Sequence, residues 1–124
     1  MIHLEIKTFS SLSFSPDEPV LASSFDTNSR RLIIALTKAY ADDKVLEGVR
    51  VEISDWTDAK ILIGEQVLRL SDELSDICEF EYQGNKIRLA GFLRNAPGWY
   101  DITFLNPQLS VEYASEEKFA SRLP

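Results

Sequence analysis

The sequence predicts an α+β fold that is mainly β: a single antiparallel curved sheet, a sandwich or a partly open barrel, with one or two short helices. Three observations lead to this prediction. Apolar and polar residues alternate with period two in several short segments, as in half-buried strands. Turn sequences rich in Gly, Asn, Asp and Pro separate these segments, which favours antiparallel pairing of neighbours. Helix signals occur at only two places.

The first half of the chain contains four predicted strands. Alternation over residues 2–6 predicts one strand, and a shorter one is expected within 20–25. Residues 30–41 (RRLIIALTKAYA) are apolar on both faces, which favours a central strand. We expect a polar connection over 41–48 and another alternating strand over 49–53.

Two hairpins are predicted next. Residues 55–58 (DWTD) interrupt two apolar runs, and the interval is typical of a hairpin corner. Alternation over 78–82 and again over 87–90, with Gly84 and Asn85 between, predicts a second hairpin. Glycine reaches positive φ at little cost, so Gly84 is expected to occupy the turn.

The last predicted elements include both helices. Apolar residues over 66–76 follow the spacing of one helical face, and Ser115 followed by two glutamates is typical of a terminal helix start. Further strands are expected over 99–105 and 109–113. The length of 124 residues suits one domain, so residues 1–124 are predicted to form a single domain.

Charge narrows the classes of partner. The net charge is −7, and no basic stripe is present. Nucleic acids and anionic membrane surfaces attract clustered Lys and Arg, so both are disfavoured as partners, whereas a basic protein is allowed. The N-terminal sequence MIHLEIKTF lacks the pattern of a signal peptide, and no apolar run approaches a membrane span. We therefore expect a cytoplasmic location.

The residues offer little catalytic chemistry. His3 is the only histidine and Cys78 the only cysteine, so no metal-ligand spacing exists. No phosphate-binding Gly-rich loop or nucleophile elbow occurs. We therefore predict no catalytic residue, metal or cofactor, and a buried, inert thiol at Cys78. A hydrolase that uses a pair of carboxylates stays open, because 20 acids allow many pairs.

One acidic window interrupts the otherwise mixed charges. Residues 70–85 contain no Lys or Arg, and alternation places Glu79 and Glu81 on one face of a strand. This window is either a solvated face or a patch that meets a basic partner, where opposite fields speed encounter. The candidate partner-binding residues of the window are Asp72, Glu73, Asp76, Glu79 and Glu81.

The two tryptophans suggest a second candidate surface. Tryptophan is enriched in interface hot spots but is also a common core residue, and core packing is favoured for Trp56 and Trp99. The DWTD segment is thus predicted to be a corner first and a contact surface second. Asp55, Trp56 and Asp58 are its candidate contact residues.

The order of the segments resembles a known family. The strings "LEGVRVEISDW", "KILIG", "ICEFEYQGNKIRLAGF" and "GWYDITF" follow "RRLIIAL". This order resembles small bacterial immunity proteins of polymorphic toxin systems, including contact-dependent growth inhibition. The resemblance implies a protein without catalysis that binds a cognate toxin C-terminal domain one to one. Many such toxins are basic nucleases, which suits an acidic inhibitor. A generic acidic binding or structural module and a carboxylate-dependent hydrolase remain alternatives, and the oligomeric state stays open.

Overall fold

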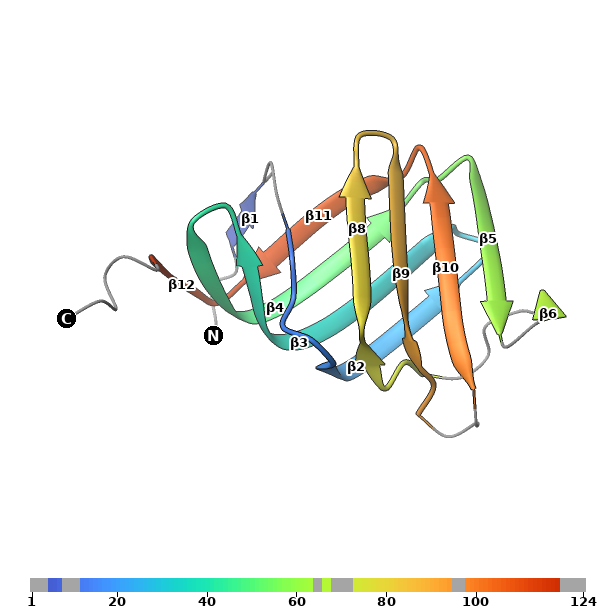
Figure 1. Cartoon of the computed structure of the whole chain (residues 1–124). Coiled ribbons are helices and arrows are strands. Elements are labelled where there is room, and N and C mark those ends of the chain that lie inside the picture. Colours follow the sequence, from blue (N-terminus) through green and yellow to red (C-terminus); the bar gives the residue numbers. More distant parts are fainter. Residues whose placement is uncertain (1–4, 8–11, 64–65, 68–72, 95–97, 119–124) are drawn as a thin grey trace.

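Two antiparallel sheets pack face to face in the computed structural model, which describes residues 5–7, 12–63, 66–67, 73–94 and 98–118 (Figure 1). The seven-stranded first sheet comprises β1 (Glu5–Lys7), β2 (Glu18–Asp26), β3 (Arg31–Ala41), β4 (Lys44–Ser54), β7 (Asp76–Ile77), β11 (Gln108–Tyr113) and β12 (Ser115–Lys118). The five-stranded second sheet comprises β5 (Asp58–Ile63), β6 (Gln66–Val67), β8 (Glu79–Gln83), β9 (Lys86–Phe92) and β10 (Trp99–Leu105).

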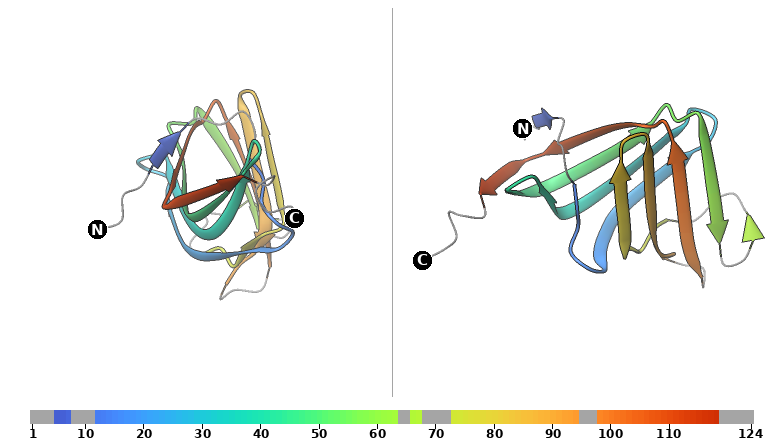
Figure 2. Two further views of the ribbon diagram at one scale, coloured as in Figure 1. Left: turned by 90° about the vertical axis from the view of Figure 1, so that its left-hand side faces the viewer. Right: turned by 45° about the horizontal axis from the view of Figure 1, so that its top comes forward.

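The strand orders define the neighbours in each sheet. The first sheet runs β1-β11-β4-β3-β2-β7, with β12 also pairing with β4. The second runs β6-β5-β10-β9-β8, so β8 lies at one margin. The β3–β4 hairpin extends well beyond the second sheet, and the strands of the two sheets run in different directions (Figure 2). The prediction of a mainly β, sandwich-like fold is confirmed.

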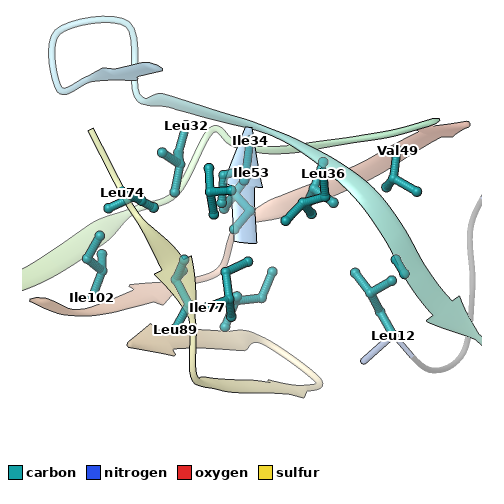
Figure 3. Close-up of a cluster of buried hydrophobic side chains, with 14 of the residues drawn as sticks. Leu12, Leu32, Ile34, Leu36, Val49, Ile53, Leu74, Ile77, Leu89 and Ile102 are labelled. Carbon is teal, nitrogen blue, oxygen red and sulfur yellow. The ribbon is translucent and has the colours of Figure 1, made fainter. Parts of the chain in front are cut away.

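The core lies between the two sheets. Alternate residues of β3 and β4, such as Leu32, Ile34 and Ile53, point toward Leu89 and Ile102 of the second sheet (Figure 3). All of these side chains are almost fully buried, as the period-two pattern requires for strands with one face on a core. Burial of this apolar surface is the main favourable contribution to folding.

The predicted helices are wrong wherever the structure describes the residues. Ser115–Lys118 is β12, which pairs antiparallel with β4 between Lys44 and Glu47. The projecting part of β4 offers free main-chain groups, and this pairing overrides the local preference of a capping sequence. Within 66–76, Gln66–Val67 pairs with β5, while residues 68–72 lie outside the described part of the chain.

The expected polar connection over 41–48 is also wrong. The strands β3 and β4 continue until Ala41 pairs with Lys44, which leaves a two-residue turn of Asp42 and Asp43. Asp42 has a φ of 55°, a conformation that Asp tolerates better than most residues. Asp42 and Asp43 form only the turn, whereas Val45 and Leu46 are buried in the core.

The corner at 55–58 joins the two layers instead of closing a hairpin. Ser54 ends β4, which pairs with β3 and β11 in the first sheet, whereas Asp58 begins β5, which pairs with β10 in the second. The predicted hairpin at 83–86 is confirmed, because Gln83 pairs with Lys86. Gly84 has a φ of 55°, as expected for this turn.

Candidate protein-binding surface

The outer face of the second sheet carries three of the eight candidate partner-binding residues: Asp58, Glu79 and Glu81. Inward residues of β10, such as Tyr100 and Ile102, are fully buried, so the alternate residues point away from the first sheet. Strand register then places polar and apolar side chains in rows across the four longer strands. The outer face comprises Asp58, Lys60, Leu62, Glu79, Glu81, Lys86, Arg88, Phe92, Trp99, Asp101, Thr103 and Leu105.

Three carboxylates surround one guanidinium on this face. Arg88 Nη2 and Nε donate to the two oxygens of Asp101, at 2.7 and 3.1 Å. Its Nη1 donates to Glu79 Oε1 at 3.1 Å and lies 3.8 Å from Glu81 Oε1. These contacts, with Asp101 first, raise the pKa of Arg88 above its ordinary value. We call Glu79, Glu81, Arg88 and Asp101 the acidic cluster; its formal charge is two negative units.

An aromatic pair lies one row from the acidic cluster. Phe92 pairs with Trp99 in the strand register, next to the row of Ala90 and Asp101. The two rings meet edge to face, with centroids 5.0 Å apart, and Phe92 is 51 % exposed. Trp99 is half-buried on the outer face, so its predicted packing in the core is wrong. Acidic and exposed aromatic side chains are therefore adjacent.

Trp56 has the opposite environment. Its side chain is 4 % exposed, and its ring lies 4.5 Å from that of Phe104 and 5.8 Å from that of Phe25, between centroids. The prediction of core packing is confirmed for this residue. Trp56 presents almost no surface to a partner, although it was a candidate contact residue.

The two aspartates of the corner are exposed but locally bonded. Asp55 has a φ of 54°, and its N–H donates to the Arg30 carbonyl at 3.0 Å. Asp58 Oδ1 accepts from the Ala59 N–H at 3.0 Å. Asp58 also borders a hollow of about 370 Å³ on the outer face. The hollow is lined by Asp58, Lys60, Lys86, Thr103 and Leu105.

The two candidate surfaces do not merge into one acidic patch. Three strand spacings, or about 14 Å, separate β5 from β8. Lys60 and Lys86 lie between Asp58 and the acidic cluster in the register. Negative charge on the outer face is therefore concentrated at the β8 margin.

The residues of the acidic window have different roles in the structure. Asp76 Oδ1 accepts from the Phe92 N–H at 2.9 Å, and the Asp76 carbonyl accepts from the Tyr100 hydroxyl at 2.7 Å. Glu73 Oε2 lies 3.2 Å from Arg94 Nη1. Asp76 on β7 thus links the first sheet to β9 and β10 of the second sheet, and Glu73 pairs with Arg94. Asp72 lies outside the described residues. Glu79 and Glu81 share the exposed face that the alternation predicted.

The sequence did not predict three important residues of this surface: Arg88, Phe92 and Asp101. Asp101 alternates with buried Tyr100 and Ile102, so its outward direction could have been found from the pattern. Its contact with Arg88 depends on the register of β9 against β10, which no local pattern gives. Phe92 ends an alternating run, and its exposure follows from its position near the end of β9.

Cys78 lies where the chain passes from the first sheet to the second. Burial, with contributions from Asp17 and Asp76, raises the pKa of the half-buried Cys78 thiol to about 12. Such a pKa keeps the thiol protonated near neutral pH. The predicted full burial is wrong, because Cys78 is only half-buried, and its lack of reactivity stays a prediction. Cys78 also borders a groove of about 360 Å³ beside β8.

Comparison with known proteins provides no relative. No protein-family model, curated protein or solved structure shows significant similarity to this chain. The part of the chain that the structure describes contains no helix able to cross a membrane. No group of three metal-binding side chains occurs among these same residues.

Proposed function

We propose that this protein is an immunity protein of a polymorphic toxin system. It binds a cognate toxin C-terminal domain in a one-to-one complex and neutralises it without catalysis. The contact surface is the outer face of the second sheet, centred on the acidic cluster and the aromatic pair. The toxin is a basic protein of the nuclease type, and the complex forms in the cytoplasm of the producing cell.

One observation supports this proposal most strongly. Glu79, Glu81 and Asp101 share Arg88 near an exposed sheet margin, one row from the exposed ring of Phe92 and the half-buried ring of Trp99. Interface hot spots combine aromatic anchors with charged groups that complement the partner. A face that only meets solvent needs neither a surplus of carboxylates nor a partly exposed aromatic pair.

The charge of the cluster suits a basic target. Nucleases that act on phosphate backbones carry clustered Lys and Arg, and an acidic surface attracts those groups over long distances. Because Arg88 holds the carboxylates of Asp101 and Glu79 by hydrogen bonds, less side-chain entropy is lost when the complex forms. The remaining negative charge is available to the cations of a partner.

The proposal predicts that a neighbouring gene encodes the toxin domain, and the test uses that domain. Co-expression should protect cells, and calorimetric titration should give one-to-one stoichiometry. Glu79→Lys with Glu81→Lys should slow association by about tenfold or more and weaken its salt dependence.

The matched control reverses two glutamates on the outer face of the first sheet. Glu52 and Glu112 also pair with arginines, Arg31 and Arg50 respectively. Their double replacement by Lys changes the net charge equally and should alter association far less. Equal effects of both double variants would show that only net charge matters. Neutralisation by trace amounts of protein would indicate an enzyme and contradict the proposal.

A further inference from the structure

Among the described residues, the second sheet has no strand beyond β8 at one margin. β8 pairs with β9 on one side, and no described residue pairs with its other side. At the opposite margin, β5 pairs with β6 through Leu62 and Ile63. An open strand edge presents unpaired N–H and C=O groups, and another chain can pair with them.

The register shows which main-chain groups face outward. The Cys78 N–H donates to the Ala90 carbonyl at 2.8 Å, so the polar groups of Ala90 point toward β8. Main-chain direction alternates along antiparallel strands, so Glu79 and Glu81 direct their N–H and C=O groups toward β9. Phe80 and Tyr82 therefore direct theirs away from the sheet.

A groove runs along this edge. Its volume is about 360 Å³, and it lies between residues 13–16 and residues 77–81. The segment of residues 12–16 lies beside β8 in both views (Figures 1 and 2). Ser13 exchanges two main-chain hydrogen bonds with Tyr40, of 2.8 and 2.9 Å, which fix the far wall. The edge of β8 thus forms one wall of the groove, and residues 13–16 form the other wall.

The side chains along β8 differ between its two faces. Glu79 and Glu81 stand on the outer face, next to any strand that pairs with this edge. On the inner face, Phe80 is half-buried and meets Phe14 edge to face, with centroids 5.0 Å apart. In an added strand, alternate side chains would therefore face the carboxylates of Glu79 and Glu81. The side chains between them would face the rings of Phe80 and Phe14.

The same charges disfavour a second copy of this chain as the occupant. Antiparallel pairing of two β8 edges would bring Glu79 and Glu81 of one copy close to the same residues of the other. Like charges across paired strands are destabilising, and inward or edge charges of this kind limit self-association. Charge complementarity selects a basic strand instead.

We propose that an extended segment of the partner, alternating basic and apolar residues, adds to β8 as a further strand. Phe80 and Tyr82 supply the main-chain hydrogen bonds, and Glu79 and Glu81 select Lys or Arg at alternate positions. The partner's apolar side chains enter the groove over Phe14. This inference deepens the proposed function, and rests on it in taking the partner to be a basic protein.

The first test needs no toxin. The probe is a blocked peptide of about seven residues in which Lys and Val alternate, added to the full-length protein while amide NMR signals are followed. We expect the amides of Phe80 and Tyr82 to shift and to gain protection from hydrogen exchange. The same peptide N-methylated at alternate residues, which blocks strand pairing, should bind at least about tenfold more weakly. Equal binding of the two peptides would overturn the proposal.

Variants at the edge provide the second test. Tyr82→Pro removes an N–H that points away from β9, whereas Tyr82→Ala removes the ring and keeps the N–H. We expect the Pro variant to weaken peptide binding by about tenfold and the Ala variant to weaken it less. Glu79→Gln with Glu81→Gln should remove most of the salt dependence while amide protection remains. Equal binding by the Pro and Ala variants, with both folded, would contradict strand addition.

Three further outcomes separate this inference from its rivals. A dimer of the free protein that Tyr82→Pro dissociates would mean that a second copy occupies the edge, which overturns the proposal. A toxin complex that forms normally while the peptide fails to bind would remove strand addition and leave the immunity function standing. Peptide binding without neutralisation of any toxin would support strand addition and remove the immunity function.

Discussion

The corner at residues 55–58 and the β8 margin are both acidic, and each has a tryptophan within it or nearby, yet the structure uses them differently. At the corner, Trp56 is buried and Asp58 bonds to the main chain, so the segment fixes the passage between the sheets. At the margin, Glu79 and Glu81 share one arginine with Asp101 and stand exposed. The role of an acidic or aromatic residue therefore depends on the contacts that it makes within the fold.

The largest expected effect is a difference in the free energy of unfolding between variants of the two tryptophans. Trp56→Ala removes a ring packed against Phe104 and Phe25, and we expect the free energy of unfolding to fall by about 3–5 kcal/mol. Trp99→Ala removes only a half-exposed pair with Phe92 and should lower it by about 1 kcal/mol. Urea unfolding followed by circular dichroism measures both. Similar losses for the two variants would remove the distinction between corner and margin.

The next largest effect is a difference in the free energy of unfolding between variants of Asp76 and Glu81, two acids of the acidic window. Asp76→Ala leaves the Phe92 N–H without its acceptor, which we expect to lower the free energy of unfolding by about 1–3 kcal/mol. Glu81→Ala removes an exposed side chain 3.8 Å from Arg88 and should change it by less than about 0.5 kcal/mol. Parallel denaturant titrations of the two variants make the comparison. A larger loss for Glu81→Ala would mean that the margin is structural.

These paired variants also show what the sequence could and could not predict. Alternation placed Glu79 and Glu81 on one face correctly, because side-chain direction in a strand is a local property. The hydrogen bond that the Phe92 N–H donates to Asp76 joins β9 to β7. The pairing of Arg88 with Asp101 depends on the register of β9 against β10. Neither contact follows from local periodicity.

The errors in element type have the same physical origin. Ser115 and the glutamates after it carry helix-start signals, yet the projecting end of β4 supplies a pairing partner there. At residues 55–58, a polar break between two apolar runs is equally consistent with a hairpin and with a crossover between layers. The burial of Trp56 between the sheets decides for the crossover. Long-range contacts therefore determined the outcome wherever local preferences were weak.

A smaller effect is expected at the turn that leads from β8 into β9. A Cβ added to Gly84 would meet no heavy atom within 4 Å, so only its φ of 55° opposes substitution. Gly84→Val should lower the free energy of unfolding by about 1 kcal/mol or more, whereas Gly84→Asn should have a smaller effect, since Asn tolerates this conformation. Thermal unfolding of both variants provides the measurement. Indistinguishable midpoints for Val and Asn would show that the turn relaxes to negative φ.

The smallest effect concerns Glu18, a largely buried residue of β2 that pairs with Ile77 of β7. Burial raises the pKa of Glu18 above its ordinary value, with partial opposition from Lys38. A carboxyl whose pKa is higher in the folded state than in the unfolded state contributes stability below the unfolded pKa, and that contribution is lost as pH rises through the folded pKa. Glu18→Gln should therefore become slightly more stable than the wild type as pH rises from about 4 to 7.

Asp26 provides a control of opposite sign. Its carboxylate accepts hydrogen bonds from the main chain of Ser29 and Asn28, and these lower the pKa of Asp26. Stability from such a group is present above the unfolded pKa and is lost as pH falls through the folded pKa. Asp26→Asn should therefore be less stable than the wild type near neutral pH, and the difference should shrink toward low pH. Urea midpoints of both variants, measured across this pH range, test the pair. If the two differences changed in the same direction with pH, burial would not be raising the pKa of Glu18 while hydrogen bonds lower that of Asp26.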